Sequence, residues 1–229
     1  MKTLNQYILE SLKRYKPSTI DTKKHKEQLP EDCSEYFANQ KVDVDDIENL
    51  DTSNVMYMEY MFSGATFNQT SLDLSSWDVS KVENIEGMFS ACDSLKALDL
   101  STWDVSNLIH MKNIFEECRR LEYIDLSGWD VSNVIDDIYI FCNCYSLTNI
   151  IFGPGWGKSN ADNIKFILCD CGEDKGYKLS DETYESMLTM YDRKKAGLSP
   201  MEITFNRRHN IPDGFKKQME ARGYIIELK

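Results

Sequence analysis

A four-residue motif, Trp-Asp-Val-Ser, recurs in this 229-residue chain at a fixed interval of 26 residues. A fixed period of about 20 to 50 residues is typical of repeat proteins, in which each copy stacks on the next. Because one copy cannot bury its own apolar face, stacking predicts a continuous core over residues 51–175. The motif begins at Trp77, Trp103 and Trp129, and the same interval relates Met88-Phe89, Ile114-Phe115 and Ile140-Phe141 as well as Cys92, Cys118 and Cys144.

Each copy also contains an apolar pattern that predicts a short β-strand. Leu95, Leu98 and Leu100 have the LxxLxL spacing of leucine-rich repeats, in which alternate side chains point inward. After each tryptophan we expect a turn, then a stretch ending in Met-Phe that can form a short helix on the far side of the repeat. The predicted fold class is therefore α/β: a leucine-rich-repeat solenoid with about 26-residue coils, a helical N-terminal peptide and an α/β C-terminal cap.

The flanking segments are assigned by their helix and strand signals. Residues 1–30 are predicted to be an amphipathic helix and a linker, and residues 31–50 an N-terminal cap. Residues 51–175 are the repeat region and residues 176–229 the C-terminal cap. In that cap, Ser180 is expected to begin a helix over 181–195, followed by a strand at 203–205, a helix ending near 222 and a strand at 224–228. The inward residues expected for the first of these helices are Leu179, Tyr184, Met187, Leu188 and Tyr191.

Charge is concentrated in the repeats. The net charge is −12, and residues 51–152 contain 16 acidic against 5 basic side chains. Nucleic acid needs a basic surface, so it is excluded as the expected ligand, whereas basic protein partners are permitted. The sequence has no apolar run long enough for a membrane span or a secretory signal, and its seven cysteines are interpreted as reduced thiols. We therefore expect a cytoplasmic or phage-associated protein, or a cell-surface protein if a leader has been removed. The sequence does not indicate an oligomeric state.

Two columns of side chains are candidates for binding. Asp73, Asp99 and Asp125 lie between inward-facing residues, so they should face solvent about 5 Å apart on the strand face. Such a ladder of like charges costs stability unless a cation, a lysine or a partner lies against it. The tryptophans could form an exposed aromatic stripe or could pack in a stack. The candidate binding residues are Asp73, Asp99, Asp125, Trp77, Trp103 and Trp129.

Other motifs are interpreted as structural. Residues 153–159, Gly-Pro-Gly-Trp-Gly-Lys-Ser, miss a phosphate-binding loop by one residue and predict a turn. Cys142 and Cys144 precede Cys169 and Cys171 by 27 residues, so these could bind zinc, but a column of small buried residues is the alternative. The aspartates and serines of the Trp-Asp-Val-Ser motifs are expected to cap turns. No catalytic residue, metal or cofactor is predicted.

The repeats resemble the BspA-type leucine-rich repeats of bacterial surface proteins, which also occur in mycoplasma lipoproteins. The matching segments are WDVSNL and MFSACDSLKALDLS, the resemblance covers about residues 50–175, and the final ARGYIIELK is similar to the end of such proteins. The resemblance implies binding or adhesion at a surface without catalysis. The first helix faintly resembles N-terminal peptides of proteins encoded by large phages of gut bacteria.

Three functional hypotheses follow from the sequence. The first is non-enzymatic binding of a protein partner through the acidic strand face. The second is a phage structural or cargo protein addressed by its N-terminal helix. The third is a metal-dependent hydrolase that uses the aspartate ladder.

Overall fold

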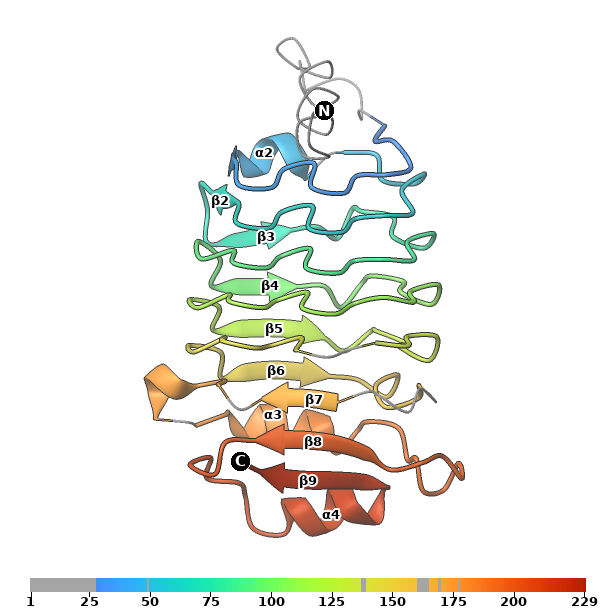
Figure 1. Ribbon diagram of the computed structural model, residues 1–229, viewed down its shortest axis with the longest axis vertical. Coiled ribbons are helices and arrows are strands. Elements are labelled where there is room, and N and C mark those ends of the chain that lie inside the picture. The colour runs from blue at the N-terminus through green and yellow to red at the C-terminus, as the bar shows by residue number, and fades with distance from the viewer. Residues whose placement is uncertain (1–27, 49, 137–138, 160–164, 169, 177) are drawn as a thin grey trace, which may run out of the picture.

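The structure is a computed structural model in which short parallel strands lie one below another, with further strands and helices at the C-terminal end (Figure 1). We call residues 28–159 the stacked region and residues 165–229 the C-terminal unit. The structure describes residues 28–48, 50–136, 139–159, 165–168, 170–176 and 178–229, so the helix expected near the N-terminus lies outside the described residues.

The stacked region contains β1 (Lys41–Val42), α2 (Val44–Ile47), β2 (Thr66–Phe67), β3 (Ser71–Asp73), β4 (Ala97–Asp99), β5 (Tyr123–Leu126) and β6 (Asn149–Phe152). The C-terminal unit contains β7 (Lys165–Leu168), the 3-10 helix η1 (Glu173–Lys175), α3 (Asp181–Met187), β8 (Met201–Phe205), α4 (Phe215–Ala221) and β9 (Tyr224–Leu228).

Four strands of the stacked region form one parallel sheet in the order β3-β4-β5-β6. The residues paired across this sheet are 26 apart, so that one 26-residue repeat forms one layer of the stack. The inward positions pair Leu72 with Leu98, then Ile124 and Ile150, and all four are buried. The 26-residue period of the sequence therefore determines which residues pair across the sheet.

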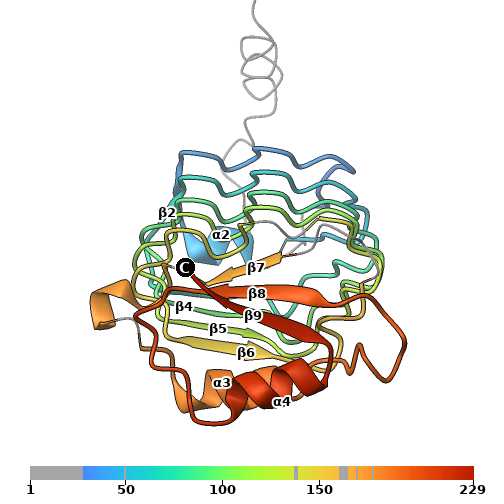
Figure 2. The same cartoon turned by 60° about the horizontal axis from the view of Figure 1, so that its bottom comes forward.

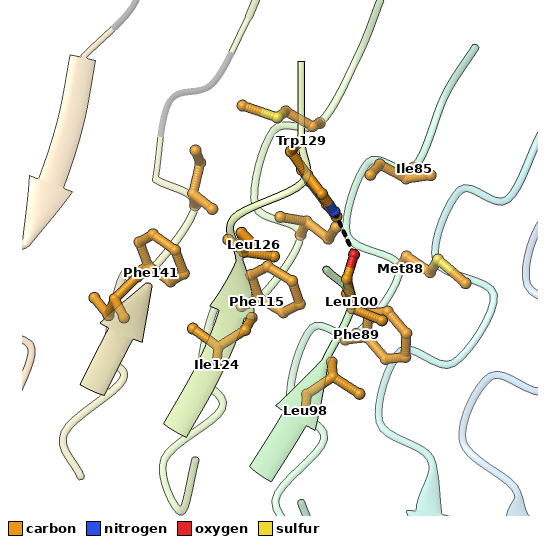
Figure 3. Packing of buried hydrophobic residues seen from close by; sticks show 14 of the residues in the cluster. Ile85, Met88, Phe89, Leu98, Leu100, Phe115, Ile124, Leu126, Trp129 and Phe141 are labelled. Atoms are coloured by element: carbon orange, nitrogen blue, oxygen red, sulfur yellow. Dashed lines mark hydrogen bonds between the residues drawn. The ribbon is translucent and has the colours of Figure 1, made fainter. Parts of the chain in front are cut away.

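A column of tryptophans runs through the core beside the sheet. Neighbouring rings lie 6.1 to 6.3 Å apart between centroids and are nearly parallel. Each indole N–H donates to a carbonyl of the layer before; Trp129 Nε1, for example, lies 2.9 Å from the Leu100 oxygen (Figure 3). The column consists of Trp77, Trp103, Trp129 and Trp156, each at most 4% exposed.

This burial corrects the expectation that placed Trp77, Trp103 and Trp129 on a binding surface, and it confirms the alternative that they pack in a stack. Their rings are enclosed by neighbouring layers and their only polar atoms are already hydrogen-bonded inside the core. They contribute to stability, because a buried indole removes a large apolar area from water.

The segment ending in Met-Phe does not form the expected short helix. Along it, alternate amides bond to different partners: Met88 N–H donates to Ile85 three residues back, whereas Phe89 N–H donates to Ile114 in the next layer. A helix would keep both bonds within the segment. We call this alternating backbone the zigzag, and it requires positive φ at two positions of each layer. The first position is occupied by Glu35, Tyr60, Gly87, Asn113 and Tyr139. The second, four residues later, is occupied by Asn39, Gly64, Ala91, Glu117 and Asn143.

Residues 32–40 form a further layer at the N-terminal end of the stack. Phe37 stacks on Phe62 with 5.3 Å between ring centroids, and Cys33 N–H donates to the Tyr57 carbonyl. Helix α2 follows and lies beside the sheet end at β3 (Figure 1). The segment expected to be a cap thus repeats the packing of the layers that follow it.

The C-terminal unit follows the order of elements expected after residue 176, with two differences. Strand β7, at residues expected to belong to the repeats, pairs with β8 and not with β6, and α3 is shorter than expected. Ser180 caps α3 as predicted, since its side chain accepts the Thr183 N–H. The helix ends at Met187 and not near residue 195, because the chain turns so that the Tyr191 N–H can donate to the Trp156 carbonyl. Tyr191 is therefore 37% exposed instead of inward. The strands expected at 203–205 and 224–228 are β8 and β9, which form a parallel sheet with β7.

Helix α3 covers the edge of β6, where the next strand of the stack would otherwise pair. Thr183 Oγ1 accepts the Ile150 N–H at 2.9 Å and Ser186 Oγ accepts the Phe152 N–H at 3.1 Å. Unpaired strand edges promote association with other chains, and these hydroxyls satisfy two N–H groups that would otherwise be unpaired at the edge of β6. Figure 2 shows the C-terminal unit from the end, with α3 and α4 along the same side of its strands.

Candidate functional site

The outward face of β3, β4 and β5 contains the predicted aspartate ladder. The register pairs Asp73 with Asp99 and Asp99 with Asp125. Asp73 and Asp99 are exposed and Asp125 is partly buried. The ladder ends at β6, where Ile151 occupies the corresponding position. We call these three carboxylates the strand ladder.

Each carboxylate of the strand ladder holds the turn that follows its strand. The Oδ1 atom accepts the backbone N–H of the serine two residues further on, at 3.1 Å for Asp73, 2.9 Å for Asp99 and 2.9 Å for Asp125. A hydrogen bond to a charged group partly offsets repulsion between neighbouring carboxylates. Each carboxylate of the ladder therefore has a hydrogen-bond partner in the turn of its own layer.

The local environment keeps the ladder charged at its N-terminal end. The Ser75 hydroxyl and amide donate to Asp73 and hold the pKa of that carboxyl below its usual value. No ion pair between described residues involves Asp73, Asp99 or Asp125. Asp73 is therefore held in its charged form near neutral pH.

An aromatic side chain lies next to the strand ladder. Tyr123 is partly buried, and its hydroxyl donates to Asp125 Oδ2 at 3.4 Å. Burial raises the pKa of Tyr123, and the nearby Asp125 and Asp99 carboxylates raise it further. The face therefore presents carboxylates beside one phenol ring, a combination suited to the charged and apolar parts of a lysine or arginine side chain.

A second acidic column, which we call the turn ladder, follows the tryptophans. Asp78, Asp104 and Asp130 each accept the N–H of the serine two residues on, at 3.0 to 3.1 Å. The prediction that these aspartates cap turns is confirmed. The Ser80 hydroxyl and amide lower the pKa of Asp78, and Lys158 forms an ion pair with Asp130 at the C-terminal end of the column.

The cysteines at the repeat interval form the buried column that was one of the two expectations. Each thiol donates to the carbonyl of a phenylalanine in the preceding layer, at 3.0 to 3.1 Å. Burial raises the pKa of Cys118 to about 12, so the thiol is unreactive. Cys169 lies outside the described residues, and in the described ranges no three histidine, cysteine or acidic side chains could hold a metal ion. The column consists of Cys92, Cys118 and Cys144.

The glycine-rich segment 153–159 is a turn, as predicted. Trp156 extends the tryptophan column, and Lys158 is paired with Asp130. The Ser159 hydroxyl donates to the Val134 carbonyl at 2.6 Å and is buried. The lysine and serine that a phosphate loop would use therefore hold the chain to the layer before it.

One polar column was missed in the sequence. Isolated parallel bridges join Tyr57, Asn84, His110 and Asp136, and His110 Nδ1 lies 2.8 Å from Asp136 Oδ2. Asn84, His110 and Asp136 follow one another at intervals of 26 residues, so the repeat interval could have revealed the column even though the residue types differ.

In the described part of the chain, no helix is both long and apolar enough to cross a bilayer.

The family described as "Mycoplasma protein of unknown function, DUF285" matches this chain over residues 13–98 and again over residues 31–156. No curated protein and no solved structure matches this chain.

Proposed function

This chain belongs to the Mycoplasma protein family of unknown function, DUF285, and we propose that it is a non-enzymatic binding module that recognises a basic segment of a partner protein. The surface assigned to this role is the strand ladder together with Tyr123.

The observation that carries the proposal is the register of the sheet. It places Asp73, Asp99 and Asp125 in one column on an outward face. Neighbouring parallel strands lie about 4.8 Å apart, whereas a helix rises about 5.4 Å per turn, so lysine or arginine side chains on one face of a helix come close to the ladder spacing. Electrostatic complementarity of this kind favours rapid and selective encounter.

We also propose that the stacked region is a leucine-rich-repeat solenoid related to the BspA-type repeats. The 26-residue register and the inward positions of Leu98 and Leu100 support this assignment. An experimental structure in which β3, β4, β5 and β6 pair in parallel at the 26-residue register would agree with it, and strands paired at another register would not.

The test compares two sets of substitutions that remove equal charge from different faces. The first set changes Asp73, Asp99 and Asp125 to asparagine, whose amide oxygen still accepts the serine N–H that holds each turn. The second set changes Asp78, Asp104 and Asp130 to asparagine. Both proteins and the unchanged chain are used to capture proteins from a cell lysate, and a partner bound by the unchanged chain is identified by mass spectrometry.

We expect the partner to be lost by the strand-ladder set and kept by the turn-ladder set. Equal loss from both sets would mean that overall charge and not this face determines binding. Retention by both would remove the strand ladder from consideration.

A further inference from the structure

The N-terminal end of the described chain is strongly acidic. Residues 28–50 contain seven acidic side chains and one basic side chain. Three of the acids, Asp43, Asp45 and Asp46, lie at the start of α2 and are exposed. We call residues 28–50 the acidic end.

The C-terminal end of the chain has the opposite charge. Residues 188–229 contain nine basic and five acidic side chains. Exposed basic residues lie on the loops before and after β8 and at the start of α4. We call this segment the basic end; its exposed basic side chains include Lys194, Lys195, Arg207, Arg208, Lys216 and Lys217.

The two charged ends lie at opposite ends of the long axis. In Figure 1, α2 is at one end of the stack and α4 at the other. The molecule thus carries a charge separation along its length, and no described segment folds the basic end back onto α2. Opposite charges at the two ends cannot satisfy each other within one molecule, but they can between molecules.

We propose that the basic end of one molecule binds the acidic end of a second copy, so that this protein associates head to tail. A contact between two different surfaces of the same chain leaves one acidic and one basic end free, so that the assembly can grow. The contact uses neither the strand ladder nor Tyr123, and it is independent of the proposed function. Because it is formed by exposed charges, salt should weaken it strongly.

The first 27 residues offer a competing occupant for the acidic end. They contain seven basic and three acidic side chains, and their placement is outside the described residues. If they neutralise the acidic end of their own molecule, the full chain stays monomeric and the proposal is wrong. The experiment therefore uses the full chain.

The experiment measures molar mass by light scattering and sedimentation at low salt, over a range of protein concentrations. One variant carries Asp45→Lys and Asp46→Lys, which removes two negative charges from the acidic end and adds two positive charges. A second carries Lys216→Glu and Lys217→Glu. A third carries Asp99→Asn and Asp125→Asn, which removes charge from the side of the stack and serves as the control.

We expect the unchanged chain and the side control to associate, with affinity falling about tenfold as salt rises from ~0.02 to ~0.3 M. Each end variant alone should be monomeric. An equimolar mixture of the two end variants should associate again, because the unchanged basic end of the first meets the unchanged acidic end of the second. Circular dichroism confirms that each variant is folded.

A monomeric mixture, or association that the end variants do not weaken, overturns the proposal. If the side control abolishes association while Asp45→Lys with Asp46→Lys preserves it, the basic end binds the strand ladder, and the head-to-tail contact is wrong.

Discussion

The stacked region and the C-terminal unit are held together in different ways. In the middle of the stacked region one set of contacts is repeated from layer to layer: an indole N–H to a strand-end carbonyl, a thiol to a phenylalanine carbonyl, and ring on ring. In the C-terminal unit the contacts occur once. The Arg193 guanidinium, 2% exposed, donates to carbonyls of Gly157, Ser159 and Ser199.

This difference indicates how the stability of each region should respond to substitutions that remove a contact. A repeated contact is shared between neighbours, so its loss should weaken several layers together, as expected for stability that is propagated between nearest neighbours. The loss of a contact that is made once should destabilise only the part of the chain that makes it. The C-terminal unit should therefore open separately when its few polar anchors are removed.

The largest effect is expected for Trp103→Ala. The substitution removes a buried ring from the middle of the column and leaves the Leu74 carbonyl without its donor. We expect a loss of about 3 to 5 kcal/mol in the free energy of unfolding, measured by urea denaturation. Trp103→Phe keeps a ring and should lose about half as much. If Trp103→Ala loses less than about 1 kcal/mol, the column does not hold the layers together.

The next largest effect is expected for Arg193→Met. Three carbonyls lose their donor inside the protein: those of Gly157 and Ser159 at the end of the stacked region and that of Ser199 in the C-terminal unit. We expect a loss of about 3 kcal/mol that weakens the C-terminal unit and its attachment to the end of the stack. Hydrogen exchange should become faster over residues 188–229 and stay unchanged in β3, β4 and β5. Lys195→Met, at an exposed position, is the matched control and should change stability by less than about 0.5 kcal/mol. Faster exchange throughout the stack would show that the two regions unfold together.

A smaller effect is expected for Ser186→Ala on α3. The substitution leaves the Phe152 N–H at the edge of β6 without an acceptor. We expect a loss of about 1 to 2 kcal/mol in thermal or urea denaturation, together with a greater tendency to aggregate through the exposed edge. Glu185→Ala is exposed on the same helix and should be nearly neutral. Equal behaviour of the two variants would mean that α3 covers β6 by packing alone.

The smallest effects are expected in the strand ladder itself. Asp99→Ala removes the cap of the turn and should cost about 1 kcal/mol in the free energy of unfolding, whereas Asp99→Asn keeps the acceptor and should be close to neutral. Urea denaturation of both variants at neutral pH measures the difference. A large loss in Asp99→Asn would show that the charge, and not the acceptor, holds this turn.

The pH dependence of the ladder has a definite sign. Folding lowers the pKa of Asp73, so its contribution to stability is present above the unfolded value of about 3.9 and is lost as the pH falls through the folded value. Asp73→Asn should therefore lose less stability than the unchanged chain when urea denaturation is repeated at decreasing pH below about 4. Parallel curves for the two proteins would contradict the lowered pKa.

Much of the stacked region could be predicted because each layer repeats the same residue types. Leu98, Leu100 and Cys118 are buried where the periodicity placed them, and Asp99 is exposed. The zigzag of the Met-Phe segment was missed because Met88, Phe89 and Cys92 have spacings that also suit a helix. What distinguishes the zigzag from a helix is positive φ at residues such as Tyr60 and Glu117, and these residue types do not predict that conformation.

The C-terminal unit was predictable in its order of elements but not in its contacts. Ser180, Gly214 and Gly223 mark ends of helices, and those signals are local. The burial of Arg193 depends on carbonyls more than 30 residues earlier, which no local pattern specifies. The tryptophans of the candidate site were misplaced for a similar reason, since stacking and surface display of a tryptophan column have the same spacing.

The measurement that tests the proposed binding face most directly is the salt dependence of affinity for a captured partner. Each charge contact contributes to the decrease in affinity with rising salt. We expect this decrease to be clearly shallower for the chain with Asp73, Asp99 and Asp125 changed to asparagine, and unchanged for the chain with Asp78, Asp104 and Asp130 changed to asparagine. The same salt dependence in all three proteins would show that the partner does not contact the strand ladder.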